Sequence, residues 1–514
     1  MRLVAAPSQR TNLFRRDFWF GTLDSRPLGV FRIAFAALLL KDALYRLPLA
    51  YDFYSDSGVV PRAALLELAR ADRFSLMDAM PHAWMAALFF ILWAVVAALL
   101  LVGCRTRLMT VLSFIILMSV HDRNVYVLTG ADTMMRVMSF WMLFVPLGQY
   151  YSVDAWLARR RGKPLPTTVD AFPVRMMQLQ VALVYVFAGL LKLLGDTWRE
   201  GDALAYVLQL DTMLLPPGVW FRGVAPDGLL RVLTYGTILV ELSFVALVFA
   251  PVAQPPLRLL GLALGAALHL GIGILLSIPD FSLVMLISYL LFLEPEWIVA
   301  AERWLRRRLN RSLPASLPQA VGGNPDAMDS PQVHWTPSRR LLTVFLAVMM
   351  LGAIWWNVDY LGEYREPVAP MPGGVRSILW YSGLWQYWDL FAPLPLQVDG
   401  WITIPGVFED GTTLDLRTGA PPNADMQRFV VGPLVRWEKF EENVYNNQYE
   451  PILLAWGQYY CRRYNEIEAR PIGSRLATLE IHFRYRRSVP PGALPNNLDD
   501  DRLWTHWCYE EYAY

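Results

Sequence analysis

VALVYVFAGLLKLLGDTWREG, residues 181–201, places one lysine, Lys192, inside an apolar run that is long enough for most of a membrane helix. A cation inside a membrane costs a few kcal/mol, so either partners hold it or the protein uses it. Removing an ammonium group from water also favours its neutral form, which can act as a base. The alternative is that Lys192 lies near a helix end and extends its amine to the membrane surface.

The composition of the 514 residues is typical of a protein that crosses a membrane several times. Hydrophobic residues make up 55% of the chain, charged residues make up 18%, and the mean hydropathy is +0.30. Soluble domains are usually about 45–50% apolar and about 25% charged. The net charge is only +1, so we expect contact with membrane lipid and no nucleic-acid partner.

The apolar runs predict an all-α polytopic membrane bundle of about nine transmembrane helices, with a small C-terminal α+β domain outside the membrane. The expected spans are residues 27–47, 84–103, 108–121, 133–149, 173–194, 229–250, 257–278, 280–294 and 340–358. The expected divisions are an N-terminal tail (1–26), a transmembrane domain (27–300), a linker (301–339), the last transmembrane helix (340–358) and the external domain (360–514).

Basic residues predict the orientation of the bundle. They occur in the N-terminal tail and after alternate spans, at Arg105 and Arg107, at residues 159–163 and at residues 303–311. Because such loops stay in the cytoplasm, we expect the N-terminus inside and residues 360–514 outside. The N-terminal segment has no short apolar core followed by a cleavage site, so we expect a cytoplasmic tail and not a signal peptide.

Residues 360–514 have the pattern of a folded domain outside the membrane. Residues 401–404 and 479–485 read as strands, residues 409–411 supply a hairpin turn, and residues 425–466 read as helical. Four aromatic residues near the last span fit either a belt at the membrane surface or a platform for a lipid-like ligand. They are Trp385, Trp388, Phe391 and Trp401.

The chain contains three cysteines. Cys104 follows the second span, where we expect it to pack. Cys461 and Cys508 both fall in the external domain, where a disulfide is chemically allowed. Their spacing leaves open whether they pair.

Motifs of soluble enzymes are missing from the sequence: it has no P-loop, GxSxG, HExxH or CxxC motif. None of the six histidines is paired at the spacing of metal ligands, so no metal is expected. Ionisable residues within the apolar runs are better candidates, because such groups usually face the interior of a bundle. They are a polar membrane cluster of Arg32, Asp122, Asp132 and Arg136, together with Lys41, Asp42, Arg123, Lys192, Glu241 and His269.

Glu241 has both a structural and a functional interpretation. Its carboxylate can neutralise Lys192 or Arg136, and a buried pair of that kind can hold helices in register without any further role. Alternatively, Glu241 belongs to a reactive site around Lys192.

Short motifs in a common order resemble one family. They are YYSVDAW at 150–156, RRR at 159–161, VYVFAG at 184–189, Lys192-Leu193 and Trp198-x-Glu200-Gly201, with weaker matches around Arg32, Gly103, Glu241, His269, residues 281–286 and residues 295–297. Together they resemble the membrane region of vitamin K-dependent gamma-carboxylase, a module shared with bacterial relatives and called the horizontally transferred transmembrane (HTTM) domain.

The resemblance implies a mechanism and a cofactor. In the carboxylase, a lysine of this motif deprotonates vitamin K hydroquinone, and the strong base formed with oxygen removes a proton from a peptide glutamate, which then captures carbon dioxide. Lys192 matches that base, with Glu241 and His269 tuning its protonation or contacting the quinone, and Trp198 beside it. Asp122 and Asp132 are secondary candidates. The expected cofactor is reduced vitamin K or a menaquinone-type quinone.

Two departures from the carboxylase concern the substrate. The loop at residues 124–132 contains no histidine where the carboxylase has a catalytic one, and His121 does not fill that position. The external domain is also much shorter than the carboxylase's lumenal part. The chain therefore resembles bacterial members that carry Trp388-x-x-Phe391-x-Pro393, which suggests a bacterial inner or plasma membrane.

Two functions of different classes follow from the sequence. The first is a carboxylase-like lyase that uses a reduced quinone to modify a peptide or protein substrate at the outer face. The alternative is a non-catalytic accessory factor that helps to mature, export or hold a partner protein. A transporter is a third interpretation, but the inverted repeats and broken helices of transporters are not evident.

Overall fold

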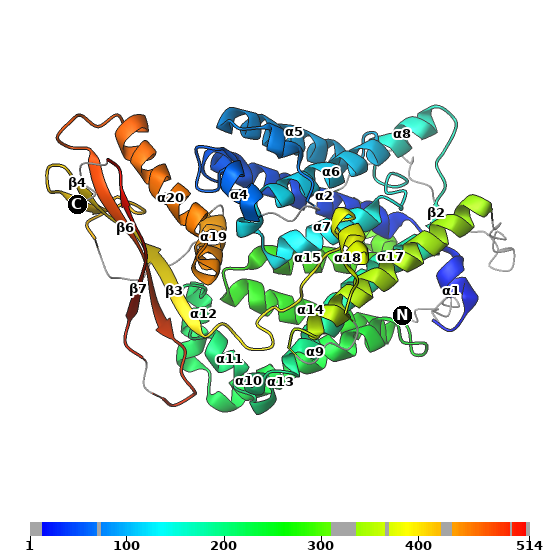
Figure 1. The fold of residues 1–514 in the computed structure, drawn as a ribbon. Coiled ribbons are helices and arrows are strands. Elements are labelled where there is room, and N and C mark those ends of the chain that lie inside the picture. The colour runs from blue at the N-terminus through cyan, green and yellow to red at the C-terminus, as the bar shows by residue number, and fades with distance from the viewer. Residues whose placement is uncertain are drawn as a thin grey trace, which may run out of the picture.

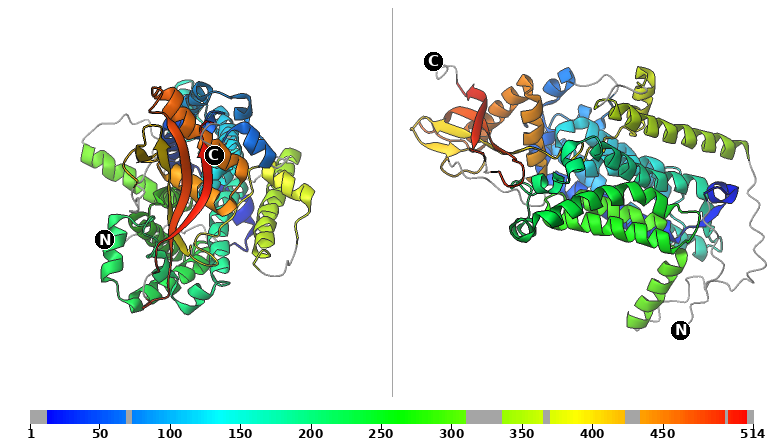
Figure 2. Two further views of the ribbon diagram at one scale, coloured as in Figure 1. Left: turned by 60° about the vertical axis from the view of Figure 1, so that its left-hand side comes forward. Right: turned by 90° about the horizontal axis from the view of Figure 1, so that it is seen from below.

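The computed structural model describes residues 13–68, 73–309, 336–364, 370–422, 434–493 and 496–509. Long helices run back and forth between two ends of the molecule, and a β-sheet formed by C-terminal residues covers one end (Figure 1). The N-terminal helix α1 (Arg16–Phe20) and helix α8 (Val153–Arg160) lie at the opposite end (Figure 1). Two further views show the same arrangement (Figure 2).

The other helices are α2 (Arg26–Arg46), α3 (Ala50–Tyr54), α4 (Arg62–Leu68), α5 (Ala83–Val102), α6 (Thr106–Arg123), α7 (Gly130–Met142), α9 (Ala171–Lys192), α10 (Asp196–Glu200), α11 (Ala203–Val207), α12 (Pro216–Val224), α13 (Asp227–Val248), α14 (Pro256–Leu275), α15 (Pro279–Ser288), α16 (Pro295–Leu309), α17 (Pro337–Leu361), α18 (Gly373–Tyr381), α19 (Leu434–Asn447) and α20 (Glu450–Arg462). The short helical turns are η1 (Leu47–Leu49), η2 (Leu76–Ala79), η3 (Val125–Val127), η4 (Tyr289–Phe292) and η6 (Arg463–Ile467). The strands are β1 (Thr22–Asp24), β2 (Thr168–Asp170), β3 (Val398–Thr403), β4 (Pro405–Phe408), β5 (Thr413–Asp415), β6 (Leu476–Arg487) and β7 (Asp499–Trp507).

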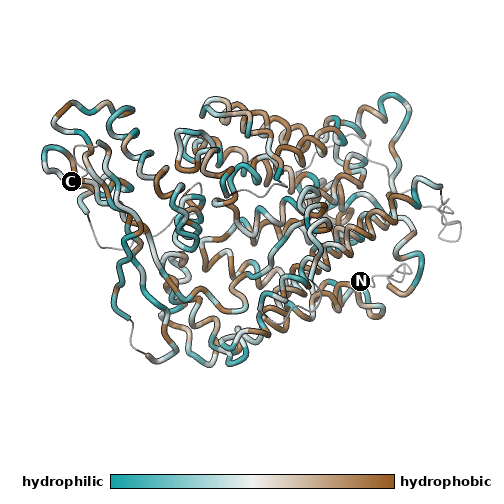
Figure 3. The backbone as a smooth tube through the Cα atoms, viewed as in Figure 1, coloured by the Kyte–Doolittle hydropathy of each residue, from teal (hydrophilic) through white to brown (hydrophobic). Residues whose placement is uncertain are grey.

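Every expected span coincides with a helix, but only 5 helices among the described residues are long and apolar enough to cross a membrane. They are α5, α9, α13, α14 and α17, and the bent pair at residues 279–292 and 295–305 would make a sixth. Helices α2 and α6 contain too many charged side chains, whereas α7 and α15 have only 13 and 10 residues. The predicted number of nine membrane spans is therefore not confirmed. The fold is nevertheless mostly helical, and the apolar residues concentrate in the long helices (Figure 3).

A glycine is required where α5 ends. Gly103 has a φ of +70°, and a side chain there would collide with Arg32 and Ser152. The Arg32 guanidinium is fully buried and donates hydrogen bonds to the backbone carbonyls of Leu147 and Tyr151, at 3.1 and 2.6 Å. This arginine therefore attaches the segment before α8 to α2.

Folded elements extend into the expected N-terminal tail and linker. Strand β1 pairs antiparallel with β2, so that Leu23 lies opposite Val169. Helix α16 continues to Leu309 and α17 begins at Pro337. Most of the expected linker, residues 310–335, and the first 12 residues of the tail lie outside the described residues.

The C-terminal sheet is antiparallel and centres on β6. One edge of β6 pairs with β7, whereas the other edge pairs with β4 and β3 in succession. Strand β5 pairs with β4, so a hairpin is present at the expected turn. Ile481, Phe483 and Tyr485 are buried and alternate with less buried residues, which gives β6 the period of two that the sequence predicted.

Helices α19 and α20 lie between the sheet and the helical bundle (Figure 1). A disulfide joins Cys461 of α20 to Cys508, directly after β7, with the two Cα atoms 5.5 Å apart. Cys104 is a free cysteine. Helix α20 is thus covalently attached to the edge strand of the sheet.

Polar contacts attach the sheet domain to the bundle. The Asp399 carboxylate in β3 accepts hydrogen bonds from the backbone N–H groups of Asp211 and Thr212, at 2.9 and 3.0 Å. Gln209 and the backbone of Val489 exchange two hydrogen bonds, of 2.8 and 2.9 Å. A third attachment, through an arginine of α19, is described below.

Candidate functional site

Lys192 and Glu241 form a buried ion pair between two long helices. Lys192 is the last residue of α9 and Glu241 lies in α13, and the Lys192 Nζ donates a hydrogen bond to Glu241 Oε1 at 2.9 Å. The two residues are 3% and 7% exposed. Gly189 permits the close approach of the helices, because a Cβ at that position would collide with Leu242. Glu241 therefore pairs with Lys192 and not with Arg136.

A tryptophan covers the ion pair. The chain turns after α9, and α10 places the ring centroid of Trp198 at 5.0 Å from the Lys192 Nζ, within the range of a cation–π contact. The Trp198 indole N–H donates a hydrogen bond to the Phe391 carbonyl at 2.7 Å. The motif around Trp198 thus connects the lysine to the segment that follows the last long helix.

His269 contributes a polar chain beside the pair. Its Nε2 lies 2.8 Å from the Tyr185 hydroxyl, which also hydrogen-bonds the Tyr289 hydroxyl. Gly265, one turn before His269, leaves room for both hydroxyl groups, since a Cβ there would crowd them. Side chains from α9, α13, α14 and η4 therefore converge in one region of the bundle.

Two buried atoms of this site, Glu241 Oε2 and His269 Nδ1, have no hydrogen-bond partner among the described residues. An unpaired buried polar atom costs about 1–3 kcal/mol, so a bound polar group that satisfied these atoms would be stabilised. The surroundings of these atoms are apolar, since Phe244 stacks on Tyr185 with ring centroids 4.1 Å apart.

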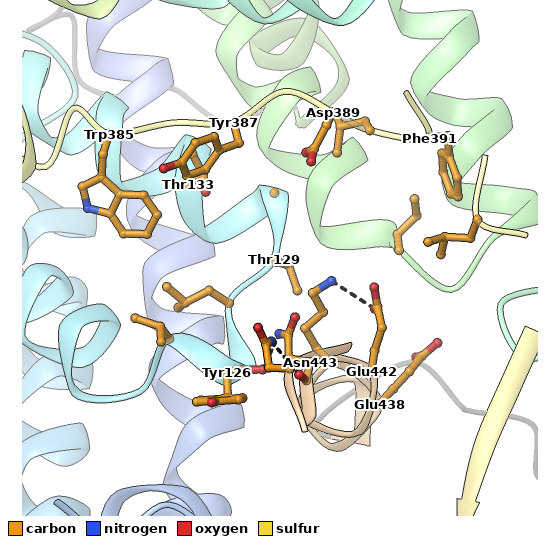
Figure 4. A pocket seen from close by; sticks show the side chains of 18 of the residues that line it. Tyr126, Thr129, Thr133, Trp385, Tyr387, Asp389, Phe391, Glu438, Glu442 and Asn443 are labelled. Atoms are coloured by element: carbon orange, nitrogen blue, oxygen red, sulfur yellow. Dashed lines mark hydrogen bonds and ion pairs between the residues drawn. The ribbon is translucent and has the colours of Figure 1, made fainter. Parts of the chain in front are cut away.

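A cavity of about 890 Å³ lies between the bundle and α19. Its walls come from residues 122–133, from the segment 385–396 and from α19 (Figure 4). The described lining residues do not include Lys192, Glu241 or His269, so the ion pair does not open directly into this cavity. Phe391 borders the cavity and accepts the hydrogen bond from Trp198, and this contact links the two regions.

The expected polar cluster is not a single cluster. Arg32 lies at the opposite end of the bundle, against the backbone carbonyls described above. The Arg136 guanidinium lies 3.4 Å from the ring centroid of Trp385 and donates to the Trp385 carbonyl at 2.7 Å. Asp122 instead accepts a hydrogen bond from the backbone N–H of Phe74 at 3.0 Å. Arg32 is therefore separate from the other three residues, because the position of a charge along an apolar run does not reveal which helix faces meet.

Asp132 belongs to a buried ion network that the sequence revealed only in part. Arg46 and Arg436 each pair with both Asp42 and Asp132, and all four residues are buried. The Arg436 Nη2 lies 2.9 Å from Asp42 Oδ1, although the two residues are 394 positions apart. No local signal in α19 marks Arg436, because its partners lie in the first and fourth expected spans.

The same network contains a histidine, His121, whose Nε2 lies 3.4 Å from Asp132 Oδ1. Ligand atoms of Asp42, His121 and Asp132 all lie within 4.8 Å of one another, a spacing that metal sites also show. The two carboxylates already bind the guanidinium groups of Arg46 and Arg436. The arginines therefore balance the charges of the two carboxylates.

The aromatic residues after the last span do not form a belt at the membrane surface, because Trp385, Trp388 and Trp401 are buried. The Trp388 indole donates to Gln386 Oε1 at 2.8 Å, and the same oxygen accepts a 2.7 Å hydrogen bond from Gln180 of α9. Trp385 and Phe391 line the cavity. These rings therefore pack the segment 385–391 onto the bundle.

Comparisons with known proteins agree with the motifs. A profile of the HTTM domain matches residues 20–297, which include the Lys192 site. An uncharacterized protein of Bacillus subtilis (strain 168), YitO, is 26% identical over 231 residues, which cover 42% of this chain and 71% of YitO. No solved structure matches the chain significantly.

Proposed function

The chain belongs to the HTTM domain family, and from this premise we propose that it is a membrane enzyme with carboxylase-like chemistry. It would use a reduced quinone to modify a peptide or protein beside its C-terminal domain. The observation that carries the proposal is the buried Lys192–Glu241 pair, whose carboxylate keeps one oxygen without a partner among the described residues. A pair that only joined two helices would be expected to satisfy both oxygens, as most buried polar atoms are satisfied.

The arrangement of the pair suits proton transfer. Glu241 Oε1 contacts the Lys192 Nζ directly, so a proton can pass between them inside the bundle. With the proton on Glu241, the neutral amine of Lys192 can accept another from a bound hydroxyl group. Trp198 covers the amine and limits the access of water, which would compete for the proton.

His269 and Glu241 also supply atoms that can orient a substrate. His269 Nδ1 and Glu241 Oε2 are free to bind polar groups, whereas the Tyr185 hydroxyl holds the other nitrogen of the imidazole. A reduced quinone bound here would supply an acidic hydroxyl group and the electrons that reduce oxygen, the oxidant in the carboxylase that the chain resembles. The resemblance to the carboxylase and the apolar rings around Tyr185 support this choice of co-substrate.

A titration with reduced menaquinone tests the proposal. Purified full-length protein in detergent would be titrated without oxygen, and binding and proton release would be recorded together. We expect saturable binding with proton release in the wild type, and loss of proton release in Lys192→Met. Lys41→Met is the matched control, because it removes another lysine of the bundle, paired with Asp280 on α15, and should leave proton release unchanged.

A double variant separates a reactive pair from a structural one. Lys192→Met alone leaves the Glu241 charge buried, which destabilises proteins by about 3–5 kcal/mol. Replacing both partners, as in Lys192→Met with Glu241→Leu, is often neutral for stability. A folded double variant without proton release supports the enzyme. A double variant that binds and deprotonates the quinone like the wild type would contradict it and favour the accessory function.

A further inference from the structure

The 890 Å³ cavity between the bundle and α19 is separate from the Lys192 site and has a distinct chemical character. Aromatic side chains form part of its wall: Tyr126, Trp385, Tyr387 and Phe391. In Figure 4 these rings lie along two sides, with Asp389 between Tyr387 and Phe391, and with Glu438 and Glu442 on α19. A volume of this size lies within the range of ligand sites in proteins, about 300–1,000 Å³.

The charges around the cavity are mostly negative. Five acidic and two basic side chains line it. Both basic groups already have acidic partners, because the Lys439 Nζ lies 3.0 Å from Glu442 and the Arg73 Nη2 lies 2.6 Å from Asp78. The remaining carboxylates therefore give the cavity an excess of negative charge.

Two of the acids keep carboxylate oxygens without a donor among the described residues. Asp122 lines the cavity and is 2% exposed, and its Oδ1 accepts no hydrogen bond from any described residue. Glu438 also lines the cavity and makes no hydrogen bond or ion pair within the described part of the chain. Asp389 accepts a hydrogen bond from the Tyr360 hydroxyl at 2.8 Å but has no cationic partner there. A buried carboxylate oxygen without a donor is a costly arrangement unless a ligand supplies one.

From this combination we propose that the cavity binds an organic cation, a guanidinium or a primary ammonium group. Carboxylates at Asp122 and Glu438 would accept charge-assisted hydrogen bonds from it. The aromatic wall would stabilise the cation through its ring faces. The carboxylates would repel an anion, and a neutral donor would leave their charge unmatched. Arginine or lysine side chains of a peptide and free polyamines both carry this chemistry.

Binding measurements on the full-length protein test the inference. Isothermal titration calorimetry in detergent at pH 9 would use a short arginine peptide, the same peptide with neutral citrulline in place of arginine, and spermidine. We expect the arginine peptide to bind at least about tenfold more tightly than its citrulline counterpart, because the charge is essential. Tighter binding of spermidine than of the peptide would identify a polyamine as the source of the cation, and the reverse would identify a peptide.

Variants locate the binding to the cavity. Asp122→Asn and Glu438→Gln should each weaken binding of the cation by about tenfold or more. Glu450→Gln, an exposed acid on α20 outside the cavity, is the matched control and should have no effect. If Asp122→Asn does not fold, Glu438→Gln on the partly exposed α19 still tests whether the cation binds in the cavity.

Three results would overturn the inference: equal affinity for the citrulline and arginine peptides, no binding of any probe, or no effect of Glu438→Gln on binding. The inference does not rest on the proposed function. The double variant Lys192→Met with Glu241→Leu should leave cation binding unchanged, so a failure of the quinone experiment and a failure of this one can be told apart.

Discussion

Glu438 shows how the surroundings of a single residue set its behaviour. Burial, followed by the neighbouring carboxylates of Glu442 and Glu441, raises the pKa of the Glu438 carboxyl to about 8, and the nearby cations Lys439 and Arg417 only partly offset this. Below that pH the carboxyl is mostly neutral, and above it the carboxylate can hold a cation. The affinity of the cavity for the arginine peptide should therefore rise as the pH increases from about 7 to 9, because arginine stays charged throughout.

Calorimetry across this pH range measures the effect. The rise should be largely absent in Glu438→Gln, whose amide does not titrate, and should persist in the Glu450→Gln control. An affinity that is independent of pH in the wild type would show that Glu438 does not contact the cation.

Residues differ in how well the sequence predicts their partners. Lys192 was one of the two partners that the sequence offered for Glu241, because Lys192 and Glu241 are each the conspicuous charge in their own apolar run. Arg436 was missed because it lies in the predicted extramembrane domain, where an arginine is ordinary. Its burial depends on how α19 lies against η3 and the start of α7, and such long-range packing leaves no local pattern.

At the scale of elements, the turn between α9 and α10 depends on Gly195. A Cβ at this position would overlap the Pro393 carbonyl. Gly195→Ala should therefore displace the segment 388–394, break the hydrogen bond from Trp198 to Phe391 and lower the stability by about 1–3 kcal/mol. It should also weaken the binding of the arginine peptide, because Phe391 lines the cavity. Thermal unfolding in detergent and calorimetry check both effects.

Gly236→Ala is the control for this substitution. A Cβ at Gly236 in α13 meets no atom within 4 Å, so the change should be neutral or stabilise the helix by about 0.5–1 kcal/mol. Equal effects of the two substitutions would mean that the contact between Gly195 and Pro393 does not hold the segment in place.

Helix positions were easier to predict than the number of membrane spans. Apolar runs mark each helix because the bundle interior and the membrane both select apolar side chains. Whether a helix spans the membrane also depends on its charges, and in α2 the Asp42 and Arg46 side chains are neutralised by partners from other elements. The strands of the C-terminal sheet were located by alternation, whereas their order around β6 depends on pairings between distant segments.

For the whole molecule, the reactivity of the cysteines tests its orientation in the membrane. The disulfide Cys461–Cys508 lies in the sheet domain, whereas Cys104 lies at the end of α5 beside α8, at the opposite end of the bundle. If the N-terminus is cytoplasmic, a membrane-impermeant maleimide should label no cysteine in intact spheroplasts. Cys104 should react once the membrane is opened, because it is partly exposed.

Mass spectrometry of the labelled protein identifies the modified residue. Cys104→Ser should abolish labelling of the unreduced protein, and reduction with a permeant thiol should make Cys461 and Cys508 available from outside. Labelling of Cys104 in intact spheroplasts would reverse the expected orientation.

The position of Arg436 in the chain determines when the buried ion network can form during synthesis. Once Asp132 has been made, the two carboxylates of Asp42 and Asp132 are matched by one arginine, Arg46, until Arg436 is synthesised 304 residues later. At roughly 5–20 residues per second, a ribosome needs on the order of 15–60 s to cover that distance. During this interval the early helices carry an unmatched negative charge. The ion network of the bundle is therefore completed only after α19 has been synthesised and packs against α2 and α7.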